Sequence, residues 1–276
     1  MSITASKAKG KIKSIAHKNN ADPRVLMRIY MMERFLERIS KSDYKENFII
    51  KAGILVTSLV GISMRSTMDI DTTIKSLDLT KETILKVVKE IADISLDDSV
   101  TFDIKKAEEI MDEMEYTGIR IHMNAICDHM ITPIKIDIST GDVITPRAIE
   151  YQYNLMIEDR AIPLFAYNLE TVLSEKLQTI LVRERANTRM RDFYDIYTLM
   201  DLYDINKNTF AMAFKATCIR RGTNHILGNE MSILKIIEED DGLLNLWNRY
   251  KDKYSYAKGI EYDFIIKSLN LLISIL

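Results

Sequence analysis

Apolar residues recur at helical spacing in some parts of this chain and alternate with polar residues in others. Asp22-Pro23 opens the first clear helical stripe, with an N-cap aspartate and a proline at the first helical position. Alternating runs are typical of strands that bury one face. We expect a loose lysine-rich helix or arm over 1–20, helices over 22–39, 54–62 and 80–94, and strands over 48–51, 68–74, 100–105, 119–127 and 133–138.

The pattern changes after about residue 151, where helical spacing becomes almost continuous. We place a soft boundary near residues 150–165. The first part, 1–155, is expected to carry the N-terminal helical arm and a mixed sheet with helices packed against it, and the second part, 156–276, to be mostly helical. Helices in the second part are expected over 169–183, 192–202, 207–220, 230–238 and 260–276.

The composition is that of an ordinary globular chain of 276 residues with ample core. The net charge is −2, so a polyanionic partner would have to be held by local basic patches rather than by the field of the whole molecule. Cys127 and Cys218 have no metal-ligand spacing and form no disulfide framework, which favours a reducing cytosol. Because the sequence has no apolar run of the length needed to span a bilayer, we expect no membrane span.

Asp69 and Asp71 form the strongest candidate site, because alternation along a strand places both carboxylates on one face. Two such carboxylates repel each other unless a cation lies between them, and a divalent metal ion is the simplest candidate. Gly53 precedes the pair at the end of an apolar run, and Asp137 lies on another short alternating run. The alternative is a solvated strand edge that happens to carry two carboxylates.

These three aspartates would suit phosphoryl-type transfer with divalent metal ions. Oxygen ligands suit magnesium, which keeps several waters and therefore needs only a few carboxylates. One metal ion would lower the pKa of an attacking hydroxyl, and another would bind a triphosphate and steady the leaving pyrophosphate.

Lys176 lies beside the apolar stripe of the helix expected over 169–183, so it can occupy a margin of the core that faces a cleft. A lysine in such a place can act as a point charge on phosphate oxygens. The alternative is a surface lysine that is paired to Glu175 or Asp192.

Four arginines and two aspartates follow within the segment 183–195. Asp192 and Asp195 are three residues apart and lie on one helical face, where Asp192 can pair with Arg191 or orient Lys176. The arginines could clamp phosphates, each guanidinium donating two hydrogen bonds. A salt-bridged connection between two helices explains the same charges equally well.

The remaining candidate residues carry weaker signals. His122 and His129 lie around a strand without a matched ligand partner, and Cys127 alternates with apolar neighbours as a core residue does. The thirteen tyrosines are scattered, and their spacing shows no stacking platform.

Six segments, taken together and in order, resemble the AbiEii/AbiGii toxin family of nucleotidyltransferases. They are Lys51-Ala52-Gly53 and residues 65–71, 116–120, 135–137, 170–176 and 189–195. The resemblance runs from about residue 25 to 205. It implies an α/β (α+β) fold, in which a polymerase-β-like nucleotidyltransferase domain with a mixed sheet is followed by a mostly helical domain that completes the active-site cleft.

The same resemblance implies the cofactor and the roles of the site residues. The expected cofactor is Mg2+ or Mn2+, held by Asp69 and Asp71, with Asp137 as the third ligand or activator. Lys176 and Asp192 join these three aspartates as the expected catalytic residues. The expected nucleotide contacts are Gly53, Arg65, Ser66, Thr67, Lys176 and Arg191.

Members of this family resemble toxins of bacterial toxin–antitoxin and abortive phage-infection systems. The implied reaction transfers a nucleotide from an NTP to an acceptor hydroxyl, with the 3′ end of RNA or tRNA as the expected acceptor, in the bacterial cytoplasm. The implied partner is a cognate DNA-binding antitoxin, encoded nearby, that need not bind the toxin directly.

Two alternatives to this function stay open. The family loop usually reads Lys-Gly-Gly followed by Thr or Ser, whereas this chain has Lys51-Ala52-Gly53-Ile54 and lacks the small hydroxyl, for which Ser66 or Thr67 is the candidate substitute. That loss lends weight to a non-catalytic sensor that binds GTP or another NTP. The other alternative is a nucleotidyltransferase of the antibiotic-modifying kind, although the basic stretches 7–18 and 183–191 favour a polyanionic acceptor.

Overall fold

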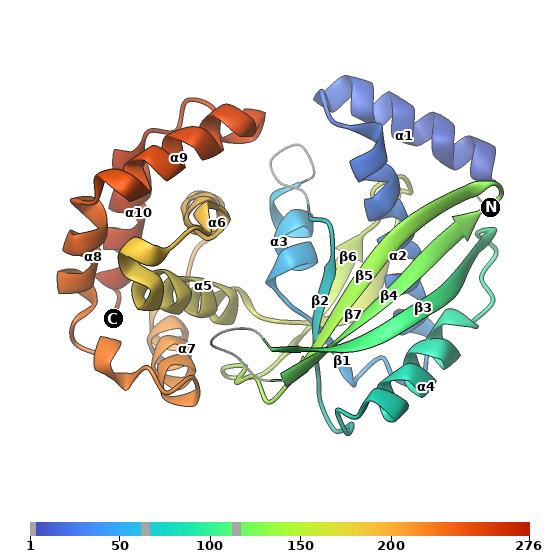
Figure 1. Cartoon of the computed structure of the whole chain (residues 1–276), viewed down its shortest axis with the longest axis horizontal. Helices are drawn as coiled ribbons and strands as arrows, with labels where there is room; N and C mark the ends of the chain where they lie inside the picture. Colours follow the sequence, from blue (N-terminus) through green and yellow to red (C-terminus); the bar gives the residue numbers. More distant parts are fainter. Residues whose placement is uncertain (1–3, 62–66, 112–116) are drawn as a thin grey trace. The chain divides into compact units, whose positions relative to one another are not determined.

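The structure, a computed structural model, describes residues 4–61, 67–111 and 117–276. The chain divides into two compact units. Unit 1 comprises Met1–Gly141 and Ile149–Ala166, and unit 2 comprises Asp142–Ala148 and Tyr167–Leu276. Unit 1 carries the sheet, whereas unit 2 is made of helices (Figure 1).

Unit 1 is built on a mixed sheet, which in the described part of the chain has seven strands in the order β3-β4-β5-β2-β1-β7-β6. Strand β2 runs parallel to β5, β1 runs parallel to β7, and the other neighbours are antiparallel. The mixed sheet with packed helices confirms the expected fold class. The elements of unit 1 are α1 (Ala5–Asn19), α2 (Pro23–Lys41), β1 (Phe48–Ile50), α3 (Ala52–Val60), β2 (Ile70–Ile74), α4 (Lys81–Ala92), β3 (Val100–Met111), β4 (Thr117–Cys127), β5 (Met130–Thr140), β6 (Ile149–Asn154) and β7 (Ala161–Ala166).

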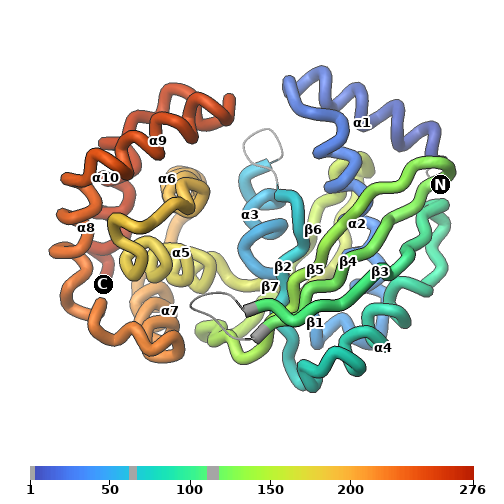
Figure 2. The backbone as a smooth tube through the Cα atoms, viewed as in Figure 1, coloured from blue at the N-terminus to red at the C-terminus, as the bar shows by residue number. Residues whose placement is uncertain are grey.

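Strands β3, β4 and β5 run side by side (Figure 2), and one of their faces is buried. On β5 the isoleucines at 134, 136 and 138 are buried, whereas Pro133, which precedes them, and Lys135, which lies among them, are exposed. Helix α2 contacts β5 and β7, and α4 contacts β3 and β4. The alternation read from the sequence therefore separates a face under the helices from a face that is left open for side-chain chemistry.

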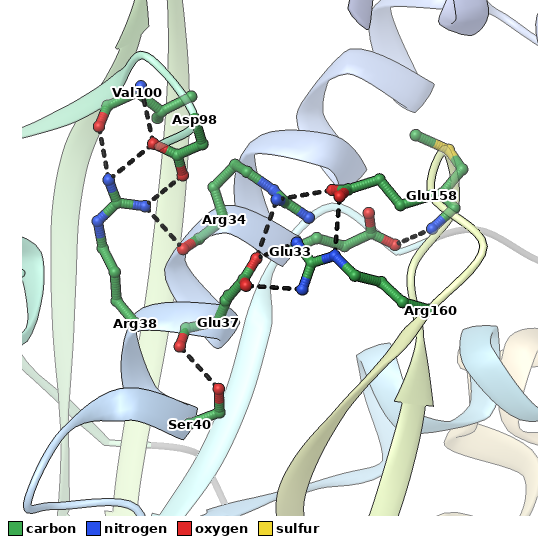
Figure 3. A network of polar contacts seen from close by, with 10 residues as sticks. Glu33, Arg34, Glu37, Arg38, Ser40, Asp98, Val100, Glu158 and Arg160 are labelled. Atoms are coloured by element: carbon green, nitrogen blue, oxygen red, sulfur yellow. Dashed lines mark hydrogen bonds and ion pairs between the residues drawn. The ribbon is translucent and has the colours of Figure 1, made fainter. Parts of the chain in front are cut away.

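Helix α2 begins as its sequence predicts, since the side chain of Asp22 accepts a hydrogen bond from the Arg24 amide at 2.8 Å and Pro23 is the first helical residue. The middle of the helix is buried on its charged side as well as on its apolar side. A network of ion pairs and hydrogen bonds ties α2 to the start of β3 and to the loop between β6 and β7 (Figure 3). Its members are Glu33, Arg34, Glu37, Arg38, Asp98, Glu158 and Arg160.

Three details of unit 1 differ from the sequence-based expectation. Strand β2 begins at Ile70, so Asp69 precedes the strand rather than lying within it. Helix α3 covers Ala52–Val60, earlier than the expected 54–62, because the chain turns directly from β1 into the helix at Lys51. The segment after residue 151 is not almost entirely helical, because β6 and β7 belong to the sheet.

Unit 2 contains the helices expected in the second half of the chain, and α5, α7 and α8 have the predicted bounds. One helix was missed: α9 begins at Asp241, the last residue of the acidic run 238–241, and Asp240 caps it by accepting from the Leu243 amide. No described helix is long and apolar enough to cross a membrane. The helical elements of unit 2 are α5 (Leu169–Arg183), η1 (Glu184–Ala186), α6 (Met190–Leu202), α7 (Lys207–Arg220), η2 (Asn224–Ile226), α8 (Glu230–Glu238), α9 (Asp241–Lys253), η3 (Ser255–Ala257) and α10 (Tyr262–Ile273).

Candidate active site

The first predicted site residues that the structure brings together are Gly53 and Asp71. A Cβ atom on Gly53 would lie 2.2 Å from Oδ2 of Asp71, which is closer than any real contact of that kind. Strand β1 leads directly into α3, and the Lys51 amide donates to the carbonyl of Asp71 at 2.9 Å, so the loop is fastened to β2. The carboxylate of Asp71 therefore lies against the first turn of a helix, and only glycine leaves it that space.

A hydroxyl group lies at the same turn, although it does not come from the position that the family usually uses. Ile54 is fully buried in the core, so its side chain cannot reach a ligand. Thr67 Oγ1 lies 3.4 Å from the position of a Cβ on Gly53 and donates to the carbonyl of Asp69 at 3.2 Å. Arg65 and Ser66, the two other predicted nucleotide contacts of this loop, lie outside the described residues.

The third aspartate, Asp137, is the neighbour of Asp71 in the sheet. Parallel pairing of β2 and β5 sets Asp71 opposite Asp137, and antiparallel pairing of β4 and β5 sets Arg120 opposite Asp137. Arg120 binds both oxygens of Asp137, each at 2.7 Å. This hydrogen bonding raises the pKa of Arg120 above its ordinary value, with a smaller contribution from the charge of Asp69. The sheet thus places three charged residues in a row across neighbouring strands: Asp71 of β2, Asp137 of β5 and Arg120 of β4.

Arg120 was not among the predicted site residues, yet the sequence holds the signal that finds it. Strands β4 and β5 are joined by a two-residue turn, Asp128-His129, with Cys127 paired to Met130. Asp128 has a φ of 54°, a conformation that aspartate tolerates better than most residues. Counting outward from this turn pairs Arg120 with Asp137, because a hairpin turn fixes the register of its strands.

Asp69 lies apart from this row, at the entrance of β2. It is partly exposed and lines a groove together with Lys135 of β5. Among the residues that the structure describes, no three His, Cys, Asp or Glu side chains form a group that could hold a metal ion. A metal site made of Asp69, Asp71 and Asp137 therefore stays a prediction.

In unit 2 the structure brings Lys176 together with Asp192 and Asp195. Lys176 projects from α5 and its Nζ lies 2.7 Å from one oxygen of each aspartate on α6. Lys176 is 6% exposed, and both aspartates are buried. The two aspartates share one helical face, as their spacing predicts, and the partner of Lys176 is Asp192, as proposed, with Asp195 in addition. The lysine is therefore buried and ion-paired rather than a surface residue.

Asp192 is held ionised by two cations. Its second oxygen accepts from Nε of Arg189 at 2.8 Å. Burial alone would raise the pKa of Asp192, but the charges and hydrogen bonds of Lys176 and Arg189 outweigh it and hold the pKa at about 2. This carboxylate is thus a permanent anion that fixes the position of the Lys176 ammonium group.

Two arginines of segment 183–191 form ion pairs, and a third, Arg191, lies near a group of tyrosines. Arg185 pairs with Asp240 at 3.5 Å and Arg189 with Asp192, as in the salt-bridged alternative. Arg191 does not pair with Asp192. Burial lowers the pKa of Arg191, but the nearby tyrosines and Asp195 raise it by a larger amount. The pKa of Arg191 therefore lies above its ordinary value.

The tyrosines near Arg191 form a cluster that the scattered sequence positions did not reveal. Ring centroids of Tyr194 and Tyr256 lie 4.9 Å apart, and those of Tyr254 and Tyr256 lie 5.2 Å apart. Tyr250 joins them through a hydroxyl contact of 3.0 Å with Tyr256. The cluster combines α6, α9 and η3, so no local spacing could have shown it.

Comparison with known proteins gives the family of the chain. The sequence matches the family described as Nucleotidyl transferase AbiEii toxin, Type IV TA system, over residues 34–267, which confirms the resemblance. A solved structure described as a nucleotidyltransferase from H. pylori is 16% identical with a TM-score of 0.48, and the match covers 92% of this chain and 96% of that one. An antigenic nucleotidyltransferase-like protein from Paracoccidioides brasiliensis is 14% identical with a TM-score of 0.41, covering 86% of this chain and 95% of that one. No curated protein matches the sequence. Because the family match spans well over half of its length, this chain belongs to the AbiEii nucleotidyltransferase toxins of type IV toxin–antitoxin systems.

Proposed function

We propose that this nucleotidyltransferase toxin transfers a nucleotidyl group from an NTP to a hydroxyl of RNA, with the 3′ end of tRNA as the expected acceptor. The acceptor oxygen forms a bond to the α-phosphorus while the bond to pyrophosphate breaks, and the hydroxyl proton passes to solvent. The observation that carries this proposal is the Asp71 carboxylate held against Gly53 at the start of α3, in a chain of a nucleotidyltransferase family.

The start of α3 supports a binding site for the triphosphate. Amide groups in the first turn of a helix have no partner within the helix and attract anions. Thr67 places a hydroxyl group at this turn, so it is our candidate for the phosphate contact that Ile54 cannot make.

The donor set of unit 1 fits Mg2+ or Mn2+. Magnesium is usually held by one or two carboxylates together with substrate phosphates, so Asp69 and Asp71 suffice as protein ligands. When bound, the ion would lower the pKa of the attacking hydroxyl and neutralise the leaving pyrophosphate. Asp137 is the weaker candidate for a third ligand or activator, because Arg120 binds both of its oxygens.

In unit 2 we propose that Lys176 contacts phosphate oxygens of the nucleotide and that Asp192 orients it. The short ion pairs of Lys176 support a fixed position for its ammonium group, and a fixed cation binds phosphate with little loss of side-chain freedom. Arg191 is the further candidate for a phosphate contact. We expect the toxin to act in the bacterial cytoplasm, opposed by a DNA-binding antitoxin that need not touch it.

The test is a turnover assay with the full chain. Purified protein is incubated with Mg2+, each labelled NTP in turn and total bacterial RNA, and both pyrophosphate and labelled RNA are measured. Asp71→Asn is expected to abolish both products, because it removes a charged ligand without changing the size of the side chain. Asp78→Asn, a change of the same kind at an exposed acid of unit 1, is the matched control and should keep full activity.

Three results would contradict the proposal. If Asp71→Asn had wild-type activity, the Asp71 carboxylate would not be needed for the reaction. Tight NTP binding without pyrophosphate release for any NTP would favour the sensor, which the burial of Ile54 also favours. Pyrophosphate release with small hydroxylated compounds but not with RNA would favour the antibiotic-modifying kind of enzyme.

A further inference from the structure

A groove of about 500 Å³ lies on unit 1 beside Asp69, and the proposed reaction does not yet use it. Its walls come from β3, β4 and β5, from the N-terminal half of α2, and from the residues that lead into β2. We call it the basic groove. Its charged or titratable lining residues are Arg28, Asp69, Lys105, Lys106, His122 and Lys135.

The register of the sheet explains why these cations meet. Lys135 lies two residues before Asp137 on β5, so both side chains point to the same face. Lys135 is paired with His122 on β4, and His122 is paired with Lys106 on β3. A row of two lysines and one histidine therefore runs across three strands, with His122 in contact with Glu108 of β3. It lies next to the row that holds Asp137, at a distance of about 7 Å for two residues of strand.

A β-bulge adds one more cation to this row. The pairing of β3 with β4 shifts between Ile104 and Lys106, so that Lys105 is the extra residue. Bulges redirect side chains that strict alternation would send to the other face. Lys105 and Lys106 both line the groove as a result, although they are adjacent in the sequence.

Within the described residues, two of the cations form no ion pair with an acid. The Arg28 guanidinium reaches only the sulfur of Met68, at 3.6 Å, and its Nε is buried without a hydrogen-bond partner in the described part of the chain. Lys135 is exposed and forms no ion pair within the described residues. Lys105 pairs with Asp103 and Lys106 pairs with Glu108, but these pairs are exposed and therefore weak.

We propose that the basic groove binds the phosphate backbone of the RNA acceptor, just upstream of the hydroxyl that reacts. This inference rests on the proposed function, and it names where the acceptor lies. The lining holds four lysine or arginine cations against one carboxylate, Asp69, and that carboxylate is a proposed ligand of the catalytic metal ion. An acceptor strand that follows the cations would thus arrive at the reacting centre.

The spread of the cations favours a chain of phosphates over a single triphosphate. They come from a helix and two strands rather than converging on one point, and the start of α3 already offers a site for the triphosphate. Since the net charge of the protein is −2, a local patch is needed to attract RNA at all. Lysine and arginine contacts to a nucleic-acid backbone release counterions, which makes the binding sensitive to salt.

The test uses the double variant Arg28→Gln/Lys135→Gln, because neither side chain is paired with an acid in the part of the chain that the structure describes. The matched control is Lys81→Gln/Lys89→Gln, which removes the same charge from exposed positions of α4. A fluorescein-labelled single-stranded RNA is titrated by anisotropy at several salt concentrations. Initial rates are measured against RNA and against NTP separately.

The groove variant is expected to raise the Kd and the KM for RNA roughly tenfold, with kcat and the KM for NTP unchanged. The slope of log K against log salt should fall by about 1.4, since each phosphate contact to a single strand contributes about 0.7. The control variant should match the wild type in every measurement.

Different failures are distinguishable. RNA affinity and KM equal to those of the wild type would overturn the groove proposal and leave the proposed function intact. A raised KM for NTP with unchanged RNA affinity would show that the groove binds the triphosphate rather than RNA, and it would also overturn the proposal. If the wild type labels no RNA, the proposed function fails, and the anisotropy titration still decides whether the groove binds RNA.

Discussion

Gly53 leaves no space for a side chain, and Asp71 is the reason. The atom that a Cβ on Gly53 would meet at 2.2 Å is the end of the Asp71 side chain, which can rotate away. We therefore expect Gly53→Ala to displace the carboxylate while the fold survives. Pyrophosphate release should fall at least tenfold. The free energy of unfolding, measured with urea, should change by no more than about 1 kcal/mol.

The control for this variant is Gly10→Ala in α1. A Cβ on Gly10 meets nothing within 4 Å, so alanine should stabilise the helix by about 0.5–1 kcal/mol and leave activity unchanged. A Gly53→Ala protein with full activity would show that the position of Asp71 is not critical for the reaction.

Lys176 requires a test that separates nucleotide binding from folding. Because the lysine is buried between two carboxylates, Lys176→Met is expected to lower the free energy of unfolding by about 3–5 kcal/mol. In Lys176→Met both carboxylates lose the lysine, and adding Asp195→Asn removes the charge of one of them. The other, Asp192, is still paired with Arg189. The double variant should therefore regain part of the lost stability, as measured by urea unfolding.

NTP affinity should not return together with that stability. If Lys176 binds phosphate, both variants lose NTP affinity by about tenfold or more, because a charge-assisted contact is missing in each. Lys215→Met, at an exposed lysine of α7, is the control. Recovery of NTP affinity in the double variant would assign Lys176 a purely structural role.

Residue types were easier to predict than residue partners. The glycine before the aspartate pair and the shared face of Asp192 and Asp195 follow from local spacing, and the structure shows both. The second acid bound to Lys176 and the burial of Ile54 depend on how distant segments pack. No local pattern contains that information.

At the scale of elements, α2 carries an acid whose proton affinity depends on folding. Glu33 is buried, and its Oε1 accepts from the Met156 amide at 2.9 Å and from Tyr153 at 3.5 Å. Burial raises the pKa of Glu33 from 4.5 to about 8, although Arg34 and the hydrogen bonds oppose the shift. The folded protein therefore keeps this proton at a pH where the unfolded chain has lost it.

The sign of the resulting pH dependence follows from this difference. The contribution of Glu33 is complete below about pH 4.5 and is lost as the pH rises through about 8, at a slope of at most about 1.4 kcal/mol per pH unit. Glu33→Gln keeps the acceptor oxygen and should flatten the fall in unfolding free energy between pH 5 and pH 8. Glu46→Gln, at an exposed acid, should leave the pH profile as in the wild type; an unchanged profile in Glu33→Gln would show that this carboxyl does not titrate in that range.

Elements with a strong apolar stripe were found from the sequence, and elements with a sparse one were missed. Helix α9 buries only Leu243 and Trp247, so its apolar stripe is too sparse to notice. Strand β7 contains Pro163, which normally argues against a strand inside a sheet. Strand β1 pairs only with Phe165 and Ala166, so the proline lies beyond the end of β1 and costs no hydrogen bond of that ladder.

At the scale of the whole molecule, the fold class could be predicted but the strand order could not. Alternating segments in the first half and helical spacing in the second are enough to indicate a sheet unit and a helical unit. The parallel pairing of β1 with β7, however, joins residues near 50 to residues near 165. Such a pairing depends on the completed sheet, because β1 is short and its sequence does not indicate which strand it pairs with.

That long-range pairing also limits when the sheet can form while the chain is being synthesised on the ribosome. Strand β1 is made early, but the strand that covers one of its edges ends only at Ala166. At about 5–20 residues per second, the chain needs on the order of 10 s to synthesise the intervening segment. Throughout that interval the edge of β1 lacks its final neighbour, so the sheet that carries Asp71 and Asp137 cannot be complete. We therefore expect the nascent enzyme to gain activity only after Ala166 has been made, several seconds after β1.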